Sequence, residues 1–409
     1  MLVSKKRIAV AVLGGLFGWV HAGYGQGPQS LNPSPRPQEE LPTTRTAPGA
    51  STPQAPSSGT PRLVSRGSGG GSRNAASRVA RAPNMFGDTL NPLVSFQGFR
   101  DASKEGASLF TAPLGGAGSF NAAENNTAVP TDRVYLAYNV FFNATSTTVG
   151  FDQNFVPIQK SSDLHRYLIG FEKTFLDGNL SVDVRMPLLS SFRLDSLGLS
   201  SDLGNVGSLT IYNKVLLFRD EDTAVATGLG VSLPTASDVT TGFSGSELLV
   251  KNHAIHLMPF IAATKNINDL WFMQSFTQMN FAASGNDVLG PSGLIGVYNE
   301  QNLFQVDMGL GRWLWQDRLR PVVTGLAGVA ELHYTTTVQD TDSISNPFNP
   351  NASILANGAN RIDLLNLTTG LQAQLGPQSN LRIGTVVPLR NQPDRVFDSE
   401  LQVSFNRRF

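Results

Sequence analysis

The stretch that decides the fold is Leu401-Gln402-Val403-Ser404-Phe405-Asn406-Arg407-Arg408-Phe409. Large apolar residues stand at 401, 403, 405 and 409, and polar residues separate them. Successive side chains of a β-strand point to opposite faces, so this alternation predicts a strand with one apolar face and one polar face. The strand runs to the last residue of the sequence, which is an aromatic.

The same period of two recurs upstream, beginning near Arg133. Val134, Leu136 and Tyr138 alternate with Tyr135, Ala137 and Asn139, while apolar patterns with the helical period of 3.6 are not evident. The alternation predicts about 12 strands. Their approximate ranges are 133–142, 164–175, 180–188, 206–218, 223–234, 253–265, 270–283, 302–314, 321–335, 361–375, 381–390 and 396–409.

The connections between these strands alternate in length. Short turns such as Leu176-Asp177-Gly178-Asn179 join one set of pairs, and Asp-Gly suits a tight turn that needs positive φ. Long polar connections join the alternate pairs, at 143–163, 189–205, 235–252, 284–301 and 336–360. Short turns on one side and long loops on the other are typical of transmembrane barrels. The sequence therefore predicts an all-β fold, a transmembrane antiparallel β-barrel of about 12 strands (range 12–14) over residues 131–409.

The N-terminus carries a targeting pattern. Lys5, Lys6 and Arg7 precede a short apolar run, and Val20-His21-Ala22 offers a cleavage site before Gly23. Residues 1–22 are therefore expected to be a signal peptide, which directs the chain to the periplasm and from there to the outer membrane of a Gram-negative-type envelope. The 409 residues include no Cys, which excludes disulfides and thiolate chemistry.

Residues 23–85 are rich in Pro, Ser, Gly and Arg and are predicted to be a disordered basic linker. The whole chain has net charge 0, of which residues 1–27 carry +3 and residues 28–85 carry +5. Residues 86–409 are therefore acidic, at −8. A solvated spacer is favoured over contact with an anionic polymer or lipid. For residues 86–130 two alternatives stay open: a plug folded into the barrel lumen, or extra strands at 93–99 and 109–112.

The polar faces of the strands are expected to line the lumen, because a lipid-facing barrel turns its apolar faces outward. The expected lumen-lining residues are Arg166, Glu172, Asp183, Arg185, Asp307, Glu331, His333 and Glu400. An acidic body favours a weak cation preference, provided that these acids line the pore. Most Trp and Tyr residues lie near strand ends and are expected to form interfacial girdles; they are Tyr138, Tyr212, Trp271, Tyr298, Trp313, Trp315 and Tyr334.

The chain offers no convincing catalytic or metal-binding constellation. His253 and His256 are three residues apart in an expected strand, so they point to opposite faces and are unsuited to chelate one metal. Glu331 and His333 share a face and could form a polar site in the mouth of the barrel, although solvated lumen residues are the more common outcome. No cofactor, metal, nucleic-acid partner or enzymatic activity is predicted.

Two segments resemble known families. Ser119–Asn126 with Pro130–Tyr135 resembles the entry strand of outer-membrane proteins predicted in planctomycete-type bacteria. Asp202-Leu203-Gly204-Asn205, with Thr227–Thr235, is similar to the transporter-like family of the MetA pathway of phenol degradation, although Ala236 stands where that family usually has Gly. The C-terminal strand resembles the signal that the barrel-insertion machinery reads, which makes Phe409 the expected point of contact.

The resemblance implies an outer-membrane channel or transporter for passive passage of small molecules, apolar ones among them, with a short N-terminal segment as a hatch. The alternative is a structural or adhesive outer-membrane barrel without an open pore. The expected partners are outer-membrane lipid, the insertion machinery and a small-molecule solute that the sequence does not name.

Overall fold

The computed structural model describes most of the chain beyond its first unit, residues 1–71. The described residues are 79, 82–88, 90, 94–97, 108–112, 120–154, 157–189, 192–196, 199–203, 206–243, 248–317, 319–345, 354–356 and 360–409. The predicted signal peptide and most of the predicted linker lie outside these residues.

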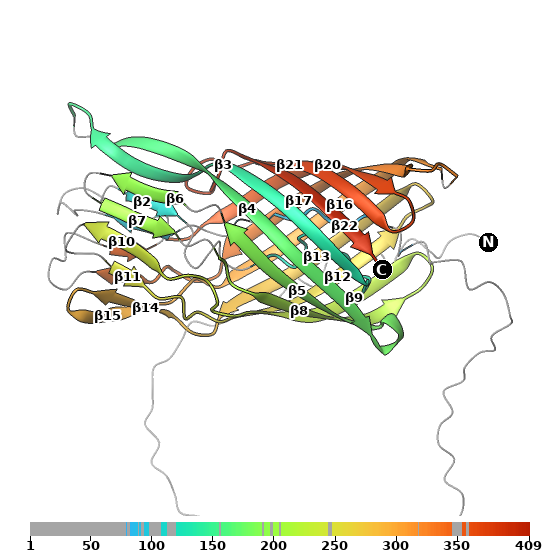
Figure 1. The fold of residues 1–409 in the computed structure, drawn as a ribbon, viewed down its shortest axis with the longest axis horizontal. Helices are drawn as coiled ribbons and strands as arrows, with labels where there is room; N and C mark the ends of the chain where they lie inside the picture. Colours follow the sequence, from blue (N-terminus) through green and yellow to red (C-terminus); the bar gives the residue numbers. More distant parts are fainter. Residues whose placement is uncertain are drawn as a thin grey trace, which may run out of the picture. The chain divides into compact units, whose positions relative to one another are not determined.

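Twelve antiparallel strands close into a β-barrel (Figure 1), which confirms the predicted fold class. The strands are β3 (Arg133–Phe151), β4 (Pro157–Phe175), β5 (Leu180–Leu189), β8 (Thr210–Arg219), β9 (Thr223–Ser232), β12 (His256–Asn266), β13 (Trp271–Ala282), β16 (Leu303–Gln316), β17 (Val323–Thr337), β20 (Asp363–Leu375), β21 (Ser379–Pro388) and β22 (Ser399–Arg408). Each strand pairs with its neighbour in the chain, and the last strand, β22, pairs with β3 to close the ring.

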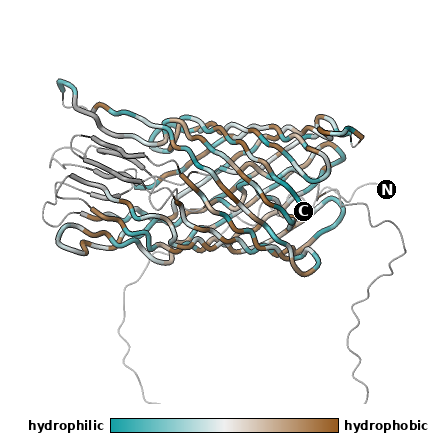
Figure 2. The backbone as a smooth tube through the Cα atoms, in the orientation of Figure 1, coloured by the Kyte–Doolittle hydropathy of each residue, from teal (hydrophilic) through white to brown (hydrophobic). Residues whose placement is uncertain are grey.

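The two faces of the barrel have opposite polarity. Leu136 and Ile169 are each 53% exposed on the outer face, whereas Arg166 and Arg185 are 1% and 0% exposed on the inner face. Figure 2 shows the resulting alternation of apolar and polar residues along the strands. A barrel that stood in water would bury its apolar face, so this arrangement defines a transmembrane barrel.

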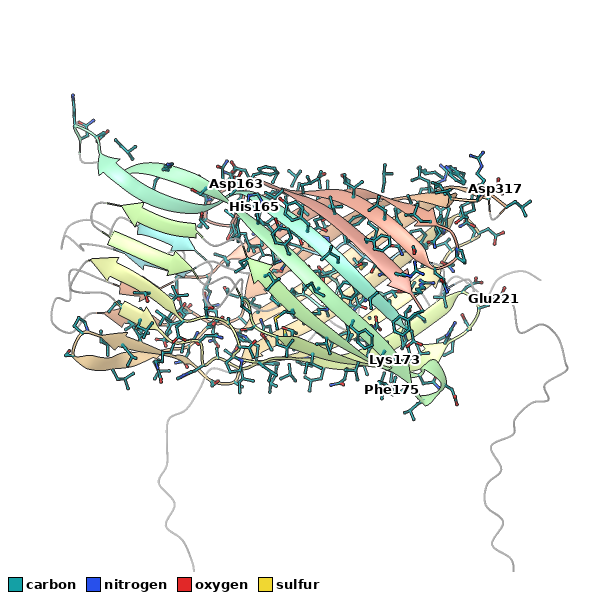
Figure 3. All side chains as sticks on the ribbon, in the orientation of Figure 1. Asp163, His165, Lys173, Phe175, Glu221 and Asp317 are labelled. Atoms are coloured by element: carbon teal, nitrogen blue, oxygen red, sulfur yellow. The ribbon has the colours of Figure 1, made fainter. Side chains whose placement is uncertain are left out.

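One end of the barrel carries the short turns, and we call it the turn end. The turn after β4 is the 3-10 helix η2 (Leu176–Gly178), in which Asp177 and Gly178 both have positive φ, at 57° and 83°. The C-terminal strand ends on the same side (Figure 1), and Glu221 and Asp317 lie there too (Figure 3). The predicted alternation of connection lengths therefore places the C-terminus beside the short turns.

The opposite end, which we call the loop end, holds more regular structure than the sequence predicted. The segment 143–163 was expected to be a loop, but β3 and β4 extend into it and pair with each other as far as Phe151 and Pro157. The other long connections contain short strands: β6 (Phe192–Ser196), β7 (Leu199–Leu203), β10 (Val239–Phe243), β11 (Leu248–Val250), β14 (Asn286–Gly290), β15 (Gly293–Tyr298), β18 (Ser343–Ser345) and β19 (Ile354–Ala356).

Two further short strands, β1 (Val94–Gln97) and β2 (Ser108–Ala112), match the ranges 93–99 and 109–112 proposed as extra barrel strands, with β2 beginning one residue earlier. They form a hairpin, in which β1 also pairs with β19 and β2 pairs with the extended part of β3. They therefore do not enter the closed ring, and the upper predicted count of 14 strands is wrong. Both are too short to cross a bilayer, which takes about 9–11 residues per strand.

The predicted aromatic girdle is only partly right. Tyr212 and Trp313 are 0% and 8% exposed and point into the lumen, and Tyr298 is buried at the loop end in β15. Trp271 fits the girdle, since it is 37% exposed next to the turn end. The prediction used position along the strand and ignored the side of the pleat. Within the described residues, no helix is long and apolar enough to cross a bilayer.

Candidate functional site: the barrel lumen

The structure places all eight expected lumen-lining residues on the inner face. Each side chain is 0–1% exposed; they are Arg166, Glu172, Asp183, Arg185, Asp307, Glu331, His333 and Glu400. They come from β4, β5, β16, β17 and β22, where the period of two alternates them with outward apolar residues. Buried charges require partners, because an ion that has lost its water without compensation is strongly destabilising.

Many of these partners come from a part of the chain that lies inside the barrel. We call residues 82–88 and 120–130 the luminal segment. Val79 N donates to Glu221 O (3.1 Å) at the turn end, whereas Leu90 packs with Phe141 and Phe397 farther along the lumen. Residues 120–130 return to the turn end, where Arg133 begins β3. The chain therefore passes through the lumen twice in opposite directions, and an antiparallel bridge, Met85 to Asn126, links the two passes.

Residues 82–85 were predicted to belong to the disordered linker, and this boundary is wrong. Met85 is completely buried, and Gln274 donates to the Pro83 carbonyl (2.6 Å). The order begins earlier than composition suggested because the wall supplies packing and hydrogen-bond partners that this short stretch lacks by itself. The predicted linker and the luminal segment thus overlap.

The first pass is bound through its backbone by charged and amide side chains of β17, β21 and β22. The Glu331 carboxylate accepts hydrogen bonds from Phe86 N (2.8 and 2.9 Å to its two oxygens) and Gly87 N (3.0 Å). Arg382 donates to Asn84 O (2.8 Å), and Gln402 donates to Gly87 O (2.9 Å). These bonds fix the backbone of the segment rather than particular side chains.

The second pass is bound mainly through its own polar side chains. Arg166 donates to Glu124 in an ion pair whose side chains are 1% and 3% exposed. Asn121 donates to Asp307 (3.1 Å), and Lys214 donates to Asn126 Oδ1 (2.8 Å). Such charge-assisted bonds are worth roughly 1.5–3 kcal/mol each, so together they hold the segment firmly in the lumen.

A network of wall charges continues toward the turn end. Glu172 receives Arg133 (2.7 Å) and Lys214 (2.9 Å), while Asp183 receives Arg185 (3.0 Å) and the Tyr135 hydroxyl (2.9 Å). Arg133 also donates to Asn125 O (2.6 Å), which ties this network to the luminal segment. The wall and the segment therefore share one connected set of hydrogen bonds.

His333 lies between two carboxylates in the lumen. Its Nδ1 is 2.7 Å from Asp307 Oδ1, and its Nε2 is 3.3 Å from Glu331 Oε2. The predicted proximity of Glu331 and His333 is therefore correct, although the pair is buried in the lumen and not open at the mouth. A cationic imidazole here neutralises part of the charge on the two acids that bind the segment.

The remaining histidine prediction needs a correction. His253 precedes β12 and bonds Asp287, whereas His256 begins β12 and pairs with Glu300. The two imidazoles therefore have different carboxylate partners, and only His256 lies in the strand. In the described part of the chain, no group of three or more His, Asp or Glu side chains is arranged to hold a metal ion.

The expected lumen-lining residues did not include Arg133, Lys214 and Arg382, although Lys214 was on the polar face of its predicted strand. All three are 1–2% exposed. The sequence did contain a signal for two of them, since Lys214 and Arg382 alternate in step with the other inward-facing residues of their strands. The sequence offered a plug at 86–130 as one of two alternatives, but it did not show which residues of such a plug these cations contact.

Comparison with known proteins adds no family assignment, because no family model matches this chain and no curated protein does. Among solved structures, an outer membrane channel from Pseudomonas putida F1 shares 12% identity over 68% of this chain and 96% of its own, with a TM-score of 0.45. The translocator domain of autotransporter NalP from Neisseria meningitidis shares 10% identity over 68% of this chain and 89% of its own, with a TM-score of 0.41. The Pseudomonas putida toluene transporter TodX shares 12% identity over 68% of this chain and 90% of its own, with a TM-score of 0.39.

At TM-scores this low, the fold class rests on the strand pairing itself. The protein is a transmembrane antiparallel β-barrel with an apolar outer face and a charged lumen that its own chain occupies. The resemblance to a phenol-degradation transporter family has no matching family model behind it.

Proposed function

We propose that this protein is an outer-membrane channel for the passive passage of small molecules, apolar ones among them, and that the luminal segment closes it. The outer-membrane location is supported by the closed barrel with its apolar exterior, since barrels of this kind satisfy every backbone group without water. Passage requires no covalent step, so no catalytic residue is part of the proposal.

The observation that carries the proposal is that the wall does not fill its own lumen. Two passes of polypeptide fit side by side between the strands, linked by the bridge between Met85 and Asn126. In small barrels the inward side chains alone fill the interior. Here, displacement of the luminal segment would leave a path lined by charged and amide side chains, which is what a water-filled channel requires.

The luminal segment is suited to be movable. The hydrogen bonds that join the described residues of the luminal segment to the wall run through side chains, whereas the wall strands are joined to each other by continuous ladders. The segment can therefore leave the lumen without breaking the barrel. Closure and opening are then two states of one chain, and their populations follow the strength of these contacts.

Conductance in planar lipid bilayers tests this function. Wild-type protein should be mostly closed, and variants that weaken the contacts of the luminal segment should open more often. A gel of unboiled and boiled samples should show the mobility shift of a folded barrel for each variant. Absence of conductance from wild type and from every such variant, with folding intact, would refute the channel.

The alternative is a structural or adhesive barrel that never opens. The dense bonding of the luminal segment favours it, because Glu124, Asn125 and Asn126 each bind the wall. Under this alternative, cells lacking the protein change in surface adhesion or envelope integrity but not in solute uptake. Uptake assays alongside envelope assays therefore separate the two functions.

We further propose that the β22 strand with Phe409 is the part recognised by the barrel-insertion machinery. Phe409 is 56% exposed, and its ring stacks on Phe171 at 5.8 Å. It lies at the turn end, which faces the periplasm if the barrel has the orientation usual for its class. Crosslinking from residue 409 to the insertion machinery during assembly tests this contact.

A further inference from the structure

Phe86 of the luminal segment occupies a site that the wall has shaped for an aromatic ring. Gly370 of β20 and Gly384 of β21 are direct partners across the sheet. A Cβ added at Gly384 would lie 2.8 Å from the Phe86 ring, and one at Gly370 would lie closer still. The two glycines therefore form a floor that exists only because neither residue has a side chain. We call this floor, with Arg382, the Phe86 slot.

The guanidinium of Arg382 lies over the Phe86 ring. Its Cζ lies 4.0 Å from the Phe86 centroid, a close cation–π contact, and the Arg382 side chain is 1% exposed. Arg382 also donates to Asn125 Oδ1 (2.7 Å) and to Asn84 O (2.8 Å). Both oxygens and the ring belong to the luminal segment, so among the described residues the segment supplies the hydrogen-bond partners of this cation.

The Phe86 slot thus holds an aromatic ring and, on the same guanidinium, an oxygen acceptor. The Phe86 ring occupies the glycine floor, while Asn125 Oδ1 binds the edge of the guanidinium. A planar guanidinium binds a carboxylate more strongly than a neutral amide oxygen, because the charge assists both hydrogen bonds. An aromatic carboxylate would therefore satisfy the slot better than the segment does.

The charge balance of the wall agrees with an anionic occupant. Among the described residues, the buried cations of the wall are Arg133, Arg166, Arg185, Lys214 and Arg382, and the buried carboxylates are Glu172, Asp183, Asp307, Glu331 and Glu400. The luminal segment adds two further buried acids, Asp88 and Glu124. When the segment leaves, these two negative charges leave with it, so the open wall is more positive than the closed lumen. The cation preference expected from the acidic body therefore does not follow from the buried wall charges.

Two neighbouring charges act on Arg382 from the wall, Glu331 with attraction and Arg133 with repulsion. Glu331 is itself paired with His333, at 3.3 Å. Because the Glu331 charge is shared between His333 and Arg382, Glu331 alone does not neutralise Arg382. Once Asn84 and Asn125 withdraw, the guanidinium of Arg382 therefore favours an incoming anion.

We propose that the Phe86 slot is a binding site for small aromatic carboxylates, which displace Phe86 and thereby compete with closure. This inference rests on the proposed channel function for its role, since a solute that binds the slot stabilises the open state. The binding site itself is a separate claim about Gly370, Gly384 and Arg382, and it is tested separately.

The direct test is Phe86→Ala in the full chain, which empties the slot and leaves the rest of the luminal segment in place. Binding of benzoate is measured by calorimetry in detergent, with benzyl alcohol and acetate as probes that lack the charge or the ring. Benzoate should bind Phe86→Ala at least about tenfold more tightly than either probe, the ratio expected for one charge-assisted bond. Adding Arg382→Gln should abolish the preference over benzyl alcohol.

Phe272→Ala is the matched control. Phe272 is 1% exposed and lies over Gly311 in the same manner, and the cation–ring contacts of the described residues involve other rings. Its cavity should accept benzyl alcohol at least as well as benzoate. Equal benzoate binding in both variants, or benzoate preference that survives Arg382→Gln, would overturn the proposal.

Bilayer recordings distinguish failure of the binding-site proposal from failure of the proposed channel function. They also test the binding site if the Phe86→Ala protein does not fold. In Glu331→Gln protein, benzoate should raise the open probability, and the ion current should be anion-selective by its reversal potential. Conductance that is cation-selective and indifferent to benzoate overturns the inference while the channel stands. Benzoate binding without any conductance supports the slot and refutes transport.

Discussion

Glu331 is the strongest single attachment of the luminal segment, and Glu331→Gln should open the barrel. The carboxylate accepts three contacts from two backbone N–H groups, at 2.8, 2.9 and 3.0 Å, in a site where its side chain is 0% exposed. Glutamine replaces one acceptor oxygen with an NH2 group, which is itself a donor. At least one of the N–H groups of Phe86 and Gly87 then faces a donor and loses its partner.

The size of the effect follows from the number of bonds lost. Loss of one or two charge-assisted bonds from a buried site costs about 2–4 kcal/mol, which shifts the closed–open equilibrium by roughly 30- to 700-fold. The barrel ladder is untouched, because the backbone pairing of β17 with β16 and β20 does not involve this side chain. The variant should therefore remain a folded, heat-modifiable barrel.

Cysteine labelling reads this shift directly, since the chain contains no native Cys. Ala123 is 0% exposed in the luminal segment, so Ala123→Cys should react slowly with a maleimide in the wild-type background and much faster beside Glu331→Gln. Asp163→Asn is the matched control, because Asp163 accepts a backbone N–H bond from Asn143 (2.9 Å) in the exposed β3–β4 hairpin. Labelling rates and open probability that are unchanged by Glu331→Gln would refute the attachment described here.

Three further outcomes are expected. Gly370→Ala should push the Phe86 ring out of its slot and raise open probability, measured in bilayers against the outward-facing Leu371→Ala, because the added Cβ has no space. Deletion of Phe409 should lower the yield of inserted barrel far more than its thermal stability, compared by membrane fractionation and heat modifiability, since one stacked ring contributes only about 0.5–1.5 kcal/mol. Burial raises the pKa of the Glu300 carboxyl, but the charge of His256 and the hydrogen bonds from His256 and Asn286 together outweigh burial, so the pKa is lowered. The Glu300 carboxylate of this loop-end anchor is therefore fully charged above about pH 4.3 and loses its charge on acidification. Hydrogen exchange in β15 should rise at low pH, and Glu300→Gln should reproduce that rise at neutral pH.

The sequence predicted the barrel well because its signals are local. Alternation of apolar and polar residues fixes which side chains share a face, and in the structure Arg185 and Asp307 are buried on the polar face of their strands. The turn Asp177-Gly178 was visible because positive φ selects a few residue types. The prediction of an interfacial girdle was wrong for Tyr212 and Trp313. It used their position near a strand end and neglected that their side chains alternate onto the inner face.

The sequence by itself determined the strands, their faces, the turn end and the number of strands within two. Only the tertiary structure decided what occupies the lumen. The bonds from Glu331 to Phe86 and from Arg382 to Asn84 join residues 245 and 298 positions apart, and no periodicity in the chain encodes a contact at that separation. A short stretch such as 82–85 is indistinguishable from a linker until a closed wall surrounds it with partners. For that reason the composition predicted disorder where the barrel imposes order.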